Sequence, residues 1–439
     1  MDNRRVRRSR RLLPATAALA TAAVVLTGCA GGGSGGNGGN EGAESFGLLI
    51  NDDNQIVQDA LTTLSEGDCS AENGELGLEI ETIPQSGLDQ QLQLLGGQDA
   101  LPAQFAASGS PVVTKELDDA GQTLDLEQAL TDLGELDNLQ PAAISTIKNL
   151  YGGLIVLPYQ FNIEGVWYNK QLFADNGIEV PTTWSEFVDA SATLDAAGVT
   201  PLSASGEQGW PITRLISGYL YRELGPDALQ KVADGEAKLT DPEYVAAAQA
   251  IADLGAAGYF GEGVGSIDYD TAVAQFLTGK AGMFYMGSWT LGAFNDPEQN
   301  QIGEDDIGFF PLPEVEGGAG SADQIPANVG LPIAVSANAY DDKVGAWLSC
   351  IAENYGATSL GDQGTVSGFT VNDDVSDVPP LTELVQDTIA GTTESTLWFE
   401  ALFGAKATTT SQQNAAPLVT GAISAEEFMA KVQADLDSQ

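Results

Sequence analysis

The stretch GGLIVLPYQFNIEGVWYNKQLFADNGIEVPTTWSEF, residues 152–187, contains both kinds of element from which the chain is built. Its segment GLIVLPY (153–159) is a continuous apolar run, which predicts a strand covered on both faces. Its segment TWSE (183–186) has the spacing of a helix capping box, and Phe187 begins an apolar stripe. A buried strand followed by a capped helix is typical of an α/β protein.

The same alternation of strand-like and helix-like segments continues along the chain. Further capping boxes are expected at 240–243 and 424–427. This pattern predicts an α/β fold with largely parallel sheets. The other expected strands are 45–51, 75–83, 281–287, 307–313 and 329–337.

The N-terminus has the organisation of an export signal. Residues 1–11 contain six arginines, and the apolar run that follows is shorter than the roughly 20 residues of a membrane-spanning helix. The run ends in LTGC (26–29), which resembles a bacterial lipobox. We expect residues 1–28 to be a signal peptide and Cys29 to carry a lipid. An ordinary signal with an incidental cysteine is the alternative, and the arginine pairs leave the general and twin-arginine export routes open.

Residues 29–45 are rich in Gly, Ser and Asn, and chains of this composition behave as flexible coils. They predict a linker between the lipid and a folded part that begins near Phe46. The expected location is therefore the outer face of the cell membrane, with the lipid as the only membrane contact.

Composition excludes several classes of function. The formal net charge of −45 disfavours nucleic acid as a partner. The chain has no histidine, which removes the commonest general base and metal ligand, so we expect no metal and no cofactor. Besides Cys29 there are two cysteines, Cys69 and Cys350, which form either one disulfide or two separate buried thiols. We find no nucleophile elbow and no phosphate-binding loop in the sequence.

The motifs of residues 152–187 continue in a recognisable order. They are followed by GWPITRLI (209–216), FLTGKAGMFYMGSWTLG (276–292), DIGFFPLPEVEGG (306–318) and GAISAEEFMAKVQADLD (421–437). In order and spacing, these segments resemble the extracellular solute-binding proteins of family 1, the group that includes maltose-binding protein. The resemblance covers nearly the whole chain after the linker and is weakest over about residues 51–140.

The resemblance implies a two-lobe periplasmic-binding-protein-like fold of type II, in which each lobe is discontinuous and hinge crossovers join the two. Crossovers are expected near 158–162, near 309–313 and after the helix that contains Trp347. Lobe 1 would then comprise residues 46–160 and 310–352, and lobe 2 residues 161–309 and 353–439. On this map both Cys69 and Cys350 belong to lobe 1, which permits a disulfide without requiring it.

A sugar presents C–H groups on its ring faces and hydroxyls at its edge, so aromatic rings and planar polar groups are suited to bind it. Of the six tryptophans, Trp167, Trp184 and Trp347 lie in strand or helix patterns typical of core positions. The resemblance places the other three at the ligand, with half-buried packing as the alternative. The expected ligand-binding residues are Trp210, Trp289, Trp398, Gln160, Asn162 and Asp52, chosen from Asn51, Asp52 and Asp53, with Asn328 and Glu207 as weaker candidates.

Small residues at 106–109 occupy a lobe 1 position where the family often has an aromatic or acidic residue, which predicts a roomier or more polar wall. The implied function is a monomeric receptor that binds a neutral sugar, expected to be an oligosaccharide, and delivers it to the permease of an ABC importer. It is not expected to be an enzyme. Two alternatives stay open: the same fold binding a polyamine or peptide, and an exported glycoside hydrolase.

Overall fold

A single long strand, β4 (Val156–Asn169), carries the chain between two groups of strands in the computed structural model. The structure describes residues 43–51, 55–107, 111–392 and 394–438, all of which belong to one unit, Glu41–Gln439. The expected signal peptide and most of the linker lie outside these residues. None of the helices in the described part combines the length and the apolar character needed to span a membrane.

The strands follow the order β2-β1-β3-β8-β4-β6-β5, with β7 added beside β4 and β9 beside β8. The first half of β4 pairs with β8, up to Ile163 opposite Ala327. From Glu164 onward it pairs with β6 and then also with β7. The other strands are β1 (Phe46–Asn51), β2 (Leu78–Ile83), β3 (Gln104–Ala106), β5 (Thr200–Ser203), β6 (Ala281–Gly287), β7 (Ile307–Phe310), β8 (Ile325–Val335) and β9 (Ser395–Thr396).

The sheets are mixed, so the expectation of largely parallel sheets is wrong. Strand β1 runs parallel to β2 and β3, and β5 runs parallel to β6. Strand β4, however, is antiparallel to β6, β7 and β8. The chain leaves the first strand group on β4 and returns to it on β8, and two adjacent strands that carry a chain out and back must run in opposite directions.

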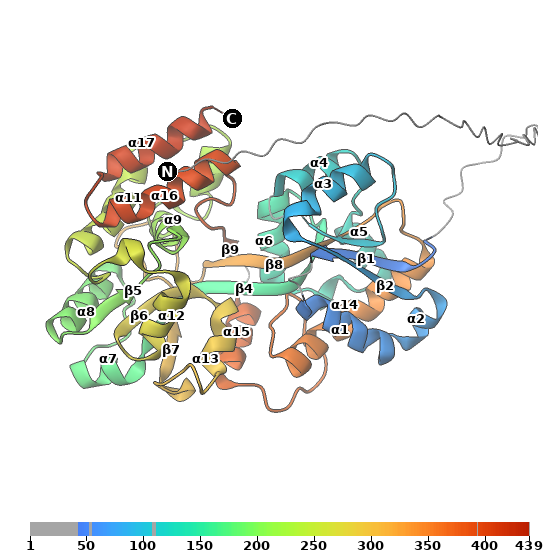
Figure 1. The fold of residues 1–439 in the computed structure, drawn as a ribbon, viewed down its shortest axis with the longest axis horizontal. Coiled ribbons are helices and arrows are strands. Elements are labelled where there is room, and N and C mark those ends of the chain that lie inside the picture. Colours follow the sequence, from blue (N-terminus) through green and yellow to red (C-terminus); the bar gives the residue numbers. More distant parts are fainter. Residues whose placement is uncertain (1–42, 52–54, 108–110, 393, 439) are drawn as a thin grey trace, which may run out of the picture. The chain divides into compact units, whose positions relative to one another are not determined.

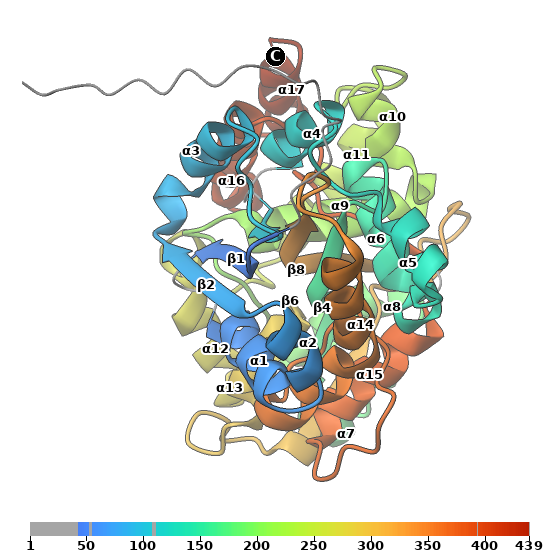
Figure 2. The same ribbon diagram turned by 90° about the vertical axis from the view of Figure 1, so that its right-hand side faces the viewer.

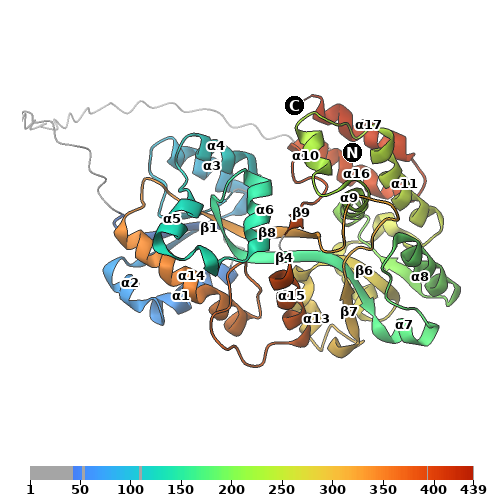
Figure 3. The same ribbon diagram turned by 180° about the vertical axis from the view of Figure 1, so that it is seen from behind.

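Helices cover the strands of both groups, as Figures 1 and 3 show. We call the part around β1, β2 and β3 lobe 1, and the part around β5, β6 and β7 lobe 2. Around lobe 1 lie α1 (Gln55–Glu66), α2 (Ser70–Glu75), α3 (Gln85–Gly96), α4 (Pro111–Asp119), α5 (Leu126–Leu133), α6 (Pro141–Tyr151) and α14 (Asp342–Gln363). The remaining helices are α7 (Lys170–Asn176), α8 (Trp184–Ala196), α9 (Trp210–Leu224), α10 (Ala228–Ala233), α11 (Pro242–Ala256), α12 (Tyr269–Leu277), α13 (Leu291–Asn295), α15 (Pro380–Gly391), α16 (Ala405–Val419) and α17 (Ala425–Leu436).

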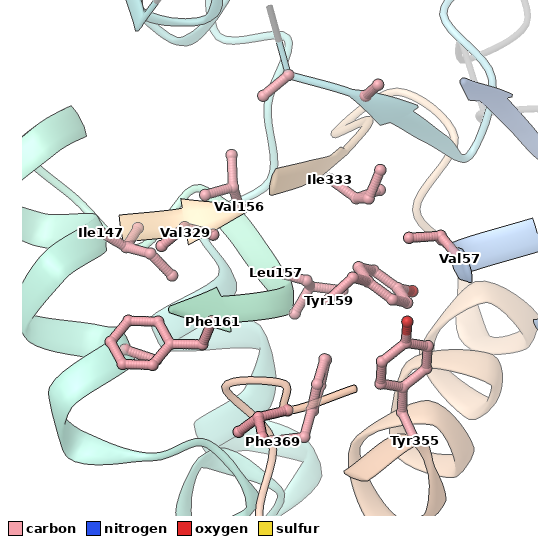
Figure 4. Close-up of a cluster of buried hydrophobic side chains, with 14 of the residues drawn as sticks. Val57, Ile147, Val156, Leu157, Tyr159, Phe161, Val329, Ile333, Tyr355 and Phe369 are labelled. Atoms are coloured by element: carbon pink, nitrogen blue, oxygen red, sulfur yellow. The ribbon is translucent and has the colours of Figure 1, made fainter. Parts of the chain in front are cut away.

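Side-chain alternation along the strands builds two hydrophobic cores. In β6, Phe284 belongs to the core that continues from lobe 1, whereas Met283 and Tyr285 belong to a second core under α9, α11 and α17. In lobe 1, Tyr159 of β4 meets Tyr355 of α14 edge to face, with ring centroids 4.6 Å apart (Figure 4). The continuous apolar run of β4 is therefore buried on both faces, as expected for such a strand.

The helix starts agree only in part with the expected capping boxes. Thr183 and Glu186 form the complete box at the start of α8. Ser424 caps α17 by accepting from the backbone N–H of Glu427. The box expected at 240–243 is absent, because Asp241 is the N-cap of α11 and its side chain instead accepts from the backbone N–H of Lys238.

Helix α14 joins the returning chain to the first part of lobe 1, and it lies beside α1 and α2 in Figure 2. The ring of Trp347 stacks on Phe46 at a centroid distance of 4.5 Å, and its indole N–H donates to the carbonyl of Leu76. Cys69 and Cys350 form a disulfide across the same contact, with 5.8 Å between their Cα atoms. The boundary expected at residue 352 falls inside α14, which continues to Gln363.

The return to lobe 1 comes later in the chain than the expected crossover at 309–313. Arg222 of α9 is buried and donates to the carbonyls of Leu312, Ser321 and Gln324, so this segment still belongs to lobe 2. The chain returns along β8 instead. We therefore propose that the lobes exchange on β4, on β8 and in the segment after α14.

We predict that removal of the Cys69–Cys350 disulfide lowers stability without changing the fold. The bond joins residues 281 positions apart, so it restricts the unfolded chain strongly. Cys69→Ala/Cys350→Ala is expected to lose about 2–4 kcal/mol of unfolding free energy. Urea unfolding measures the loss, and treating the wild-type protein with a reductant is the control. Equal unfolding midpoints with and without the bond would contradict the prediction.

Candidate functional site

A cleft with a volume of about 470 Å³ lies where both lobes and the two connecting strands meet. Lobe 1 contributes residues of β1, β3, α4 and α6, and lobe 2 contributes α9 and the turn after β6. Strands β4 and β8 contribute the residues between them. The cleft is lined by Asn51, Ala106, Ala107, Pro111, Leu150, Tyr151, Gln160, Asn162, Trp210, Arg214, Trp289, Asn328, Val329, Gly330, Leu331, Pro332 and Trp398.

Three tryptophans, Trp210, Trp289 and Trp398, come from distant parts of the chain and share this cleft. Each is only partly buried, whereas Trp167 and Trp347 are completely buried and Trp184 packs on the second core. The structure thus brings together the three tryptophans expected at the ligand, and their role as ligand contacts stays a prediction.

Two of these rings follow glycines at which a Cβ atom would collide with its surroundings. A Cβ atom at Gly287 would collide with the ring of Trp289, so the Gly-Ser-Trp sequence lets the ring fold back over the end of β6. Gly209, just before Trp210, has φ of 75°, and a Cβ atom there would collide with the backbone of Gln412. Both rings are thus fixed at the ends of elements, where they can present a face to a ligand.

Arg214 lies at the centre of the tryptophans. Its guanidinium carbon is 5.1 Å from the ring centroid of Trp210, 5.5 Å from that of Trp289 and 5.3 Å from that of Trp398. All three distances are within the range of a cation–π interaction. Arg214 follows Trp210 by one helical turn of α9, which places both side chains on the same face.

Strand β4 forms a polar floor. Gln160, Asn162 and Glu164 occupy every second position of the strand, so their side chains lie on the same face. Asn162 is paired with Asn328 of β8, and its side-chain N–H donates to the Asn328 side-chain oxygen at 3.3 Å. The floor has space for these amides because the partner strand has Gly330, where a Cβ atom would collide with the Gln160 side chain.

Two carboxylates outside the cleft lining act on Arg214, one by an ion pair and one through its charge alone. Arg214 forms an ion pair with Glu164, which also accepts from the Asn328 side chain at 3.3 Å. Glu400 is buried and accepts from the hydroxyls of Thr213 and Ser411. Burial lowers the pKa of the Arg214 guanidinium to about 10, against the opposing effect of Glu400, so this side chain is still a cation at neutral pH.

The other expected site residues divide into three groups. Asp52 and Cys29 lie outside the described residues, although Asn51, the last residue of β1, lines the cleft. Asn328 also lines it, whereas Glu207 is exposed and does not. The small residues Ala106 and Ala107 form part of the lobe 1 wall.

Arg214, Glu164 and Glu400 are not among the site residues expected from the sequence. The first two had a usable signal, because Arg214 lies one helical turn after Trp210 and Glu164 continues the i, i+2 alternation of Gln160 and Asn162. Glu400 had no such local signal, because its partner Thr213 lies far from it in sequence and its partner Ser411 lies on α16.

The arrangement of two lobes around a cleft agrees with the comparison with known proteins. The model of the family described as bacterial extracellular solute-binding protein matches residues 71–357. The chain belongs to this family. The chain matches 34% of the length of the first curated relative and 59% of the length of the second.

Two relatives and one solved structure illustrate the similarity. The Multiple sugar-binding protein of Streptococcus mutans is 24% identical over 58% of this chain and 59% of its own length. The Alpha-glucosides-binding periplasmic protein AglE of Rhizobium meliloti is 28% identical over 56% of this chain and 54% of its own. The structure of a chitin oligosaccharide binding protein is 26% identical, covers 90% of this chain and 98% of its own, and has a TM-score of 0.70.

We predict that Arg214 and Glu164 stabilise the fold only as a pair. The Glu164 side chain is 1% exposed, so Arg214→Met leaves a buried carboxylate without its cation. The expected cost is about 3–5 kcal/mol of unfolding free energy. The double variant Arg214→Met/Glu164→Gln is expected to recover most of this loss. Urea unfolding of the two single variants and the double variant measures the coupling, and simple addition of the two single losses would contradict it.

Glu400 gives a pH-dependent prediction. Burial raises the pKa of its carboxyl above the ordinary value of 4.5, so the folded protein binds this proton more tightly than the unfolded chain does. The contribution of this carboxyl to the unfolding free energy is therefore present at low pH, and it is lost as the pH rises from about 4.5 through the pKa that the group has in the folded protein. Glu400→Gln keeps an oxygen acceptor for Thr213 and Ser411 and should gain stability relative to wild type as the pH rises. Urea unfolding from pH 4 to 8 measures the difference, and a constant difference would overturn the expectation.

Proposed function

We propose that this protein is the substrate-binding protein of an ABC importer and that it binds a neutral sugar in the cleft. The observation that carries the proposal is the arrangement of three partly exposed tryptophans beside a floor of side-chain amides. Indole rings can stack on the C–H faces of a sugar ring, and amides can both donate to and accept from its hydroxyls. The names of the relatives support the same ligand class, because two are called sugar- or glucoside-binding proteins and one binds a chitin oligosaccharide.

The electrostatics of the cleft disfavour the polyamine and peptide alternative. Among the described residues that line the cleft, Arg214 is the sole charged side chain, and it is a cation. It occupies the position among the three rings that a ligand cation would otherwise take. The high negative charge of the chain is therefore a property of its surface composition and not of the described cleft.

The hydrolase alternative needs two carboxylates on opposite sides of a glycosidic bond. The lining residues that the structure describes provide none, and Glu164 and Glu400 are committed to Arg214 and to two hydroxyls. A receptor role requires only that the ligand be bound and released unchanged.

Release and delivery follow from the connections between the lobes. Movement of lobe 2 about β4, β8 and the segment after α14 would close the cleft on a sugar and bring both lobes into one docking face for the permease. In this proposal the lipid on Cys29 and the linker 29–45 keep the receptor at the outer face of the cell membrane. We propose that it acts there as a monomer.

A thermal-shift screen tests the ligand class. The panel contains xylo-, malto- and chito-oligosaccharides, raffinose, the corresponding monosaccharides and two polyamines. A ligand at 100 times its dissociation constant adds about 2.7 kcal/mol of stability, which shifts the unfolding midpoint by several degrees. We expect a neutral sugar to produce this shift and Trp289→Ala to remove it.

Trp184→Ala is the matched control. Trp184 is also partly buried, but it packs against Phe187 and Tyr219 in lobe 2 and does not line the cleft. This variant should melt earlier and still respond to the sugar. A response to a polyamine with none to any sugar would reject the proposal, and so would turnover of a bound oligosaccharide.

A further inference from the structure

The three tryptophans of the cleft form a cage of rings that are not parallel. The ring centroids of Trp210 and Trp289 are 5.8 Å apart, and their planes are inclined by 59°. Trp398 completes the cage, because its ring lies over the same guanidinium carbon that the other two rings approach. The face of an aromatic ring is its negative part, so three rings around one point make a favourable position for a cation.

The cage has supports other than Arg214. Trp210 packs against Tyr269 of α12, with ring centroids 6.2 Å apart and planes inclined by 31°. All three tryptophans are also packed against the hydrophobic core that continues from lobe 1. We therefore expect the rings to keep their places when the side chain of residue 214 is shortened.

The guanidinium of Arg214 fills the cage. Its side chain is 14% exposed, and it forms an ion pair with Glu164, whose side chain is 1% exposed. The Nε–H of Arg214 is shielded from solvent and has no hydrogen-bond acceptor among the residues that the structure describes. The ring faces surround the same guanidinium at 5.1–5.5 Å. The cage thus already contains a cation, and this cation is covalently attached to the protein.

Without Arg214, the chain would favour a cation in the cleft. Its formal net charge of −45 raises the concentration of cations near the protein surface. Removal of Arg214 would leave three rings beside the buried carboxylate of Glu164. Rings and a carboxylate together suit an organic ammonium or guanidinium ion. One side chain therefore separates a cleft that is closed to such ions from one that is open to them.

We propose that Arg214 is a specificity-determining residue, which occupies the tryptophan cage and excludes cationic ligands from the cleft. A neutral ligand can use the ring surface that Arg214 leaves uncovered, whereas an organic cation would have to displace the attached guanidinium. This inference rests on the proposed function, because it names the residue through which the sugar-binding cleft selects against cations.

Calorimetric titration with tetramethylammonium chloride at constant ionic strength tests the exclusion. This ion has no hydrogen-bond donor, so it reports on the rings and the charge of the cage. The wild-type protein should show no saturable binding. Arg214→Ala empties the cage and should bind the ion saturably. The melting temperature of this variant should also rise with the concentration of the ion, because the ion binds the folded state.

Two further variants separate the carboxylate from the rings. Arg214→Ala/Glu164→Gln has no unpaired buried carboxylate, so it should be more stable than Arg214→Ala and should bind the ion about tenfold more weakly. Arg214→Ala/Trp289→Ala lacks one wall of the cage and should also bind about tenfold more weakly than Arg214→Ala. If melting curves show that Arg214→Ala is unfolded, Arg214→Ala/Glu164→Gln decides, since it should still bind the ion when the wild-type protein does not.

Lys231→Ala is the matched control. Lys231 pairs with Asp227 at 2.9 Å, and both side chains are exposed, so this variant makes the same change of charge outside the cleft lining. It should not gain binding of the ion. An affinity of Lys231→Ala or of the wild-type protein equal to that of Arg214→Ala would overturn the inference, as would no binding to either folded variant that retains all three tryptophans. Failure of every sugar to bind the wild-type protein would reject the proposed function, while the titrations with the ion would still decide the role of Arg214.

Discussion

The antiparallel pairing of β4 with β8 is the constraint on which the site depends. One strand carries the chain out of lobe 1, and its partner brings the chain back, so both lobes are held by the same ladder. The pairing also sets the cross-strand contact of Asn162 with Asn328 and places Gly330 where its missing side chain leaves room for the Gln160 amide. The polar floor and the connection between the lobes are therefore the same structure, and in the proposed function a bound ligand would lie at the place about which the lobes move.

Local sequence patterns were sufficient for much of the fold. The apolar runs of β1, β4 and β6 and the capping box of α8 depend on neighbouring residues, and the structure has these elements where they were expected. The two-lobe α/β architecture, which the family resemblance implied, is shared with the solved structure of a chitin oligosaccharide binding protein. Local patterns did not show that Arg222 contacts residues 312–324 from 90–102 positions earlier in the chain, which is why we propose a return along β8 and not at 309–313.

The site shows the same division between local and distant information. Trp210 and Trp289 were identifiable because each follows a glycine or serine at the end of an element. Arg214 and Glu164 carry a local periodicity, but their pairing joins α9 to β4 across 50 residues. Gln363 is an ordinary glutamine near a helix end, and nothing in its neighbours indicates that its oxygen accepts no hydrogen bond from the described part of the chain. Residues whose roles arise only from packing between distant elements need the structure.

The charge arrangement around Arg214 explains how a chain of net charge −45 can have a cleft suited to a neutral ligand. The Arg214 cation is offset by Glu164, which follows Asn162 on the same face of β4, and the three rings cover the guanidinium. A charged ligand group would have to displace Glu164 or one of the rings from Arg214, and it would also lose its own hydration. A sugar hydroxyl has no such competitor, because the amides of Gln160 and Asn162 can exchange their long mutual hydrogen bond of 3.5 Å for shorter ones to the ligand. In the proposed function, the compensation of charge, rather than its absence, would thus direct the cleft toward uncharged and hydroxyl-rich molecules.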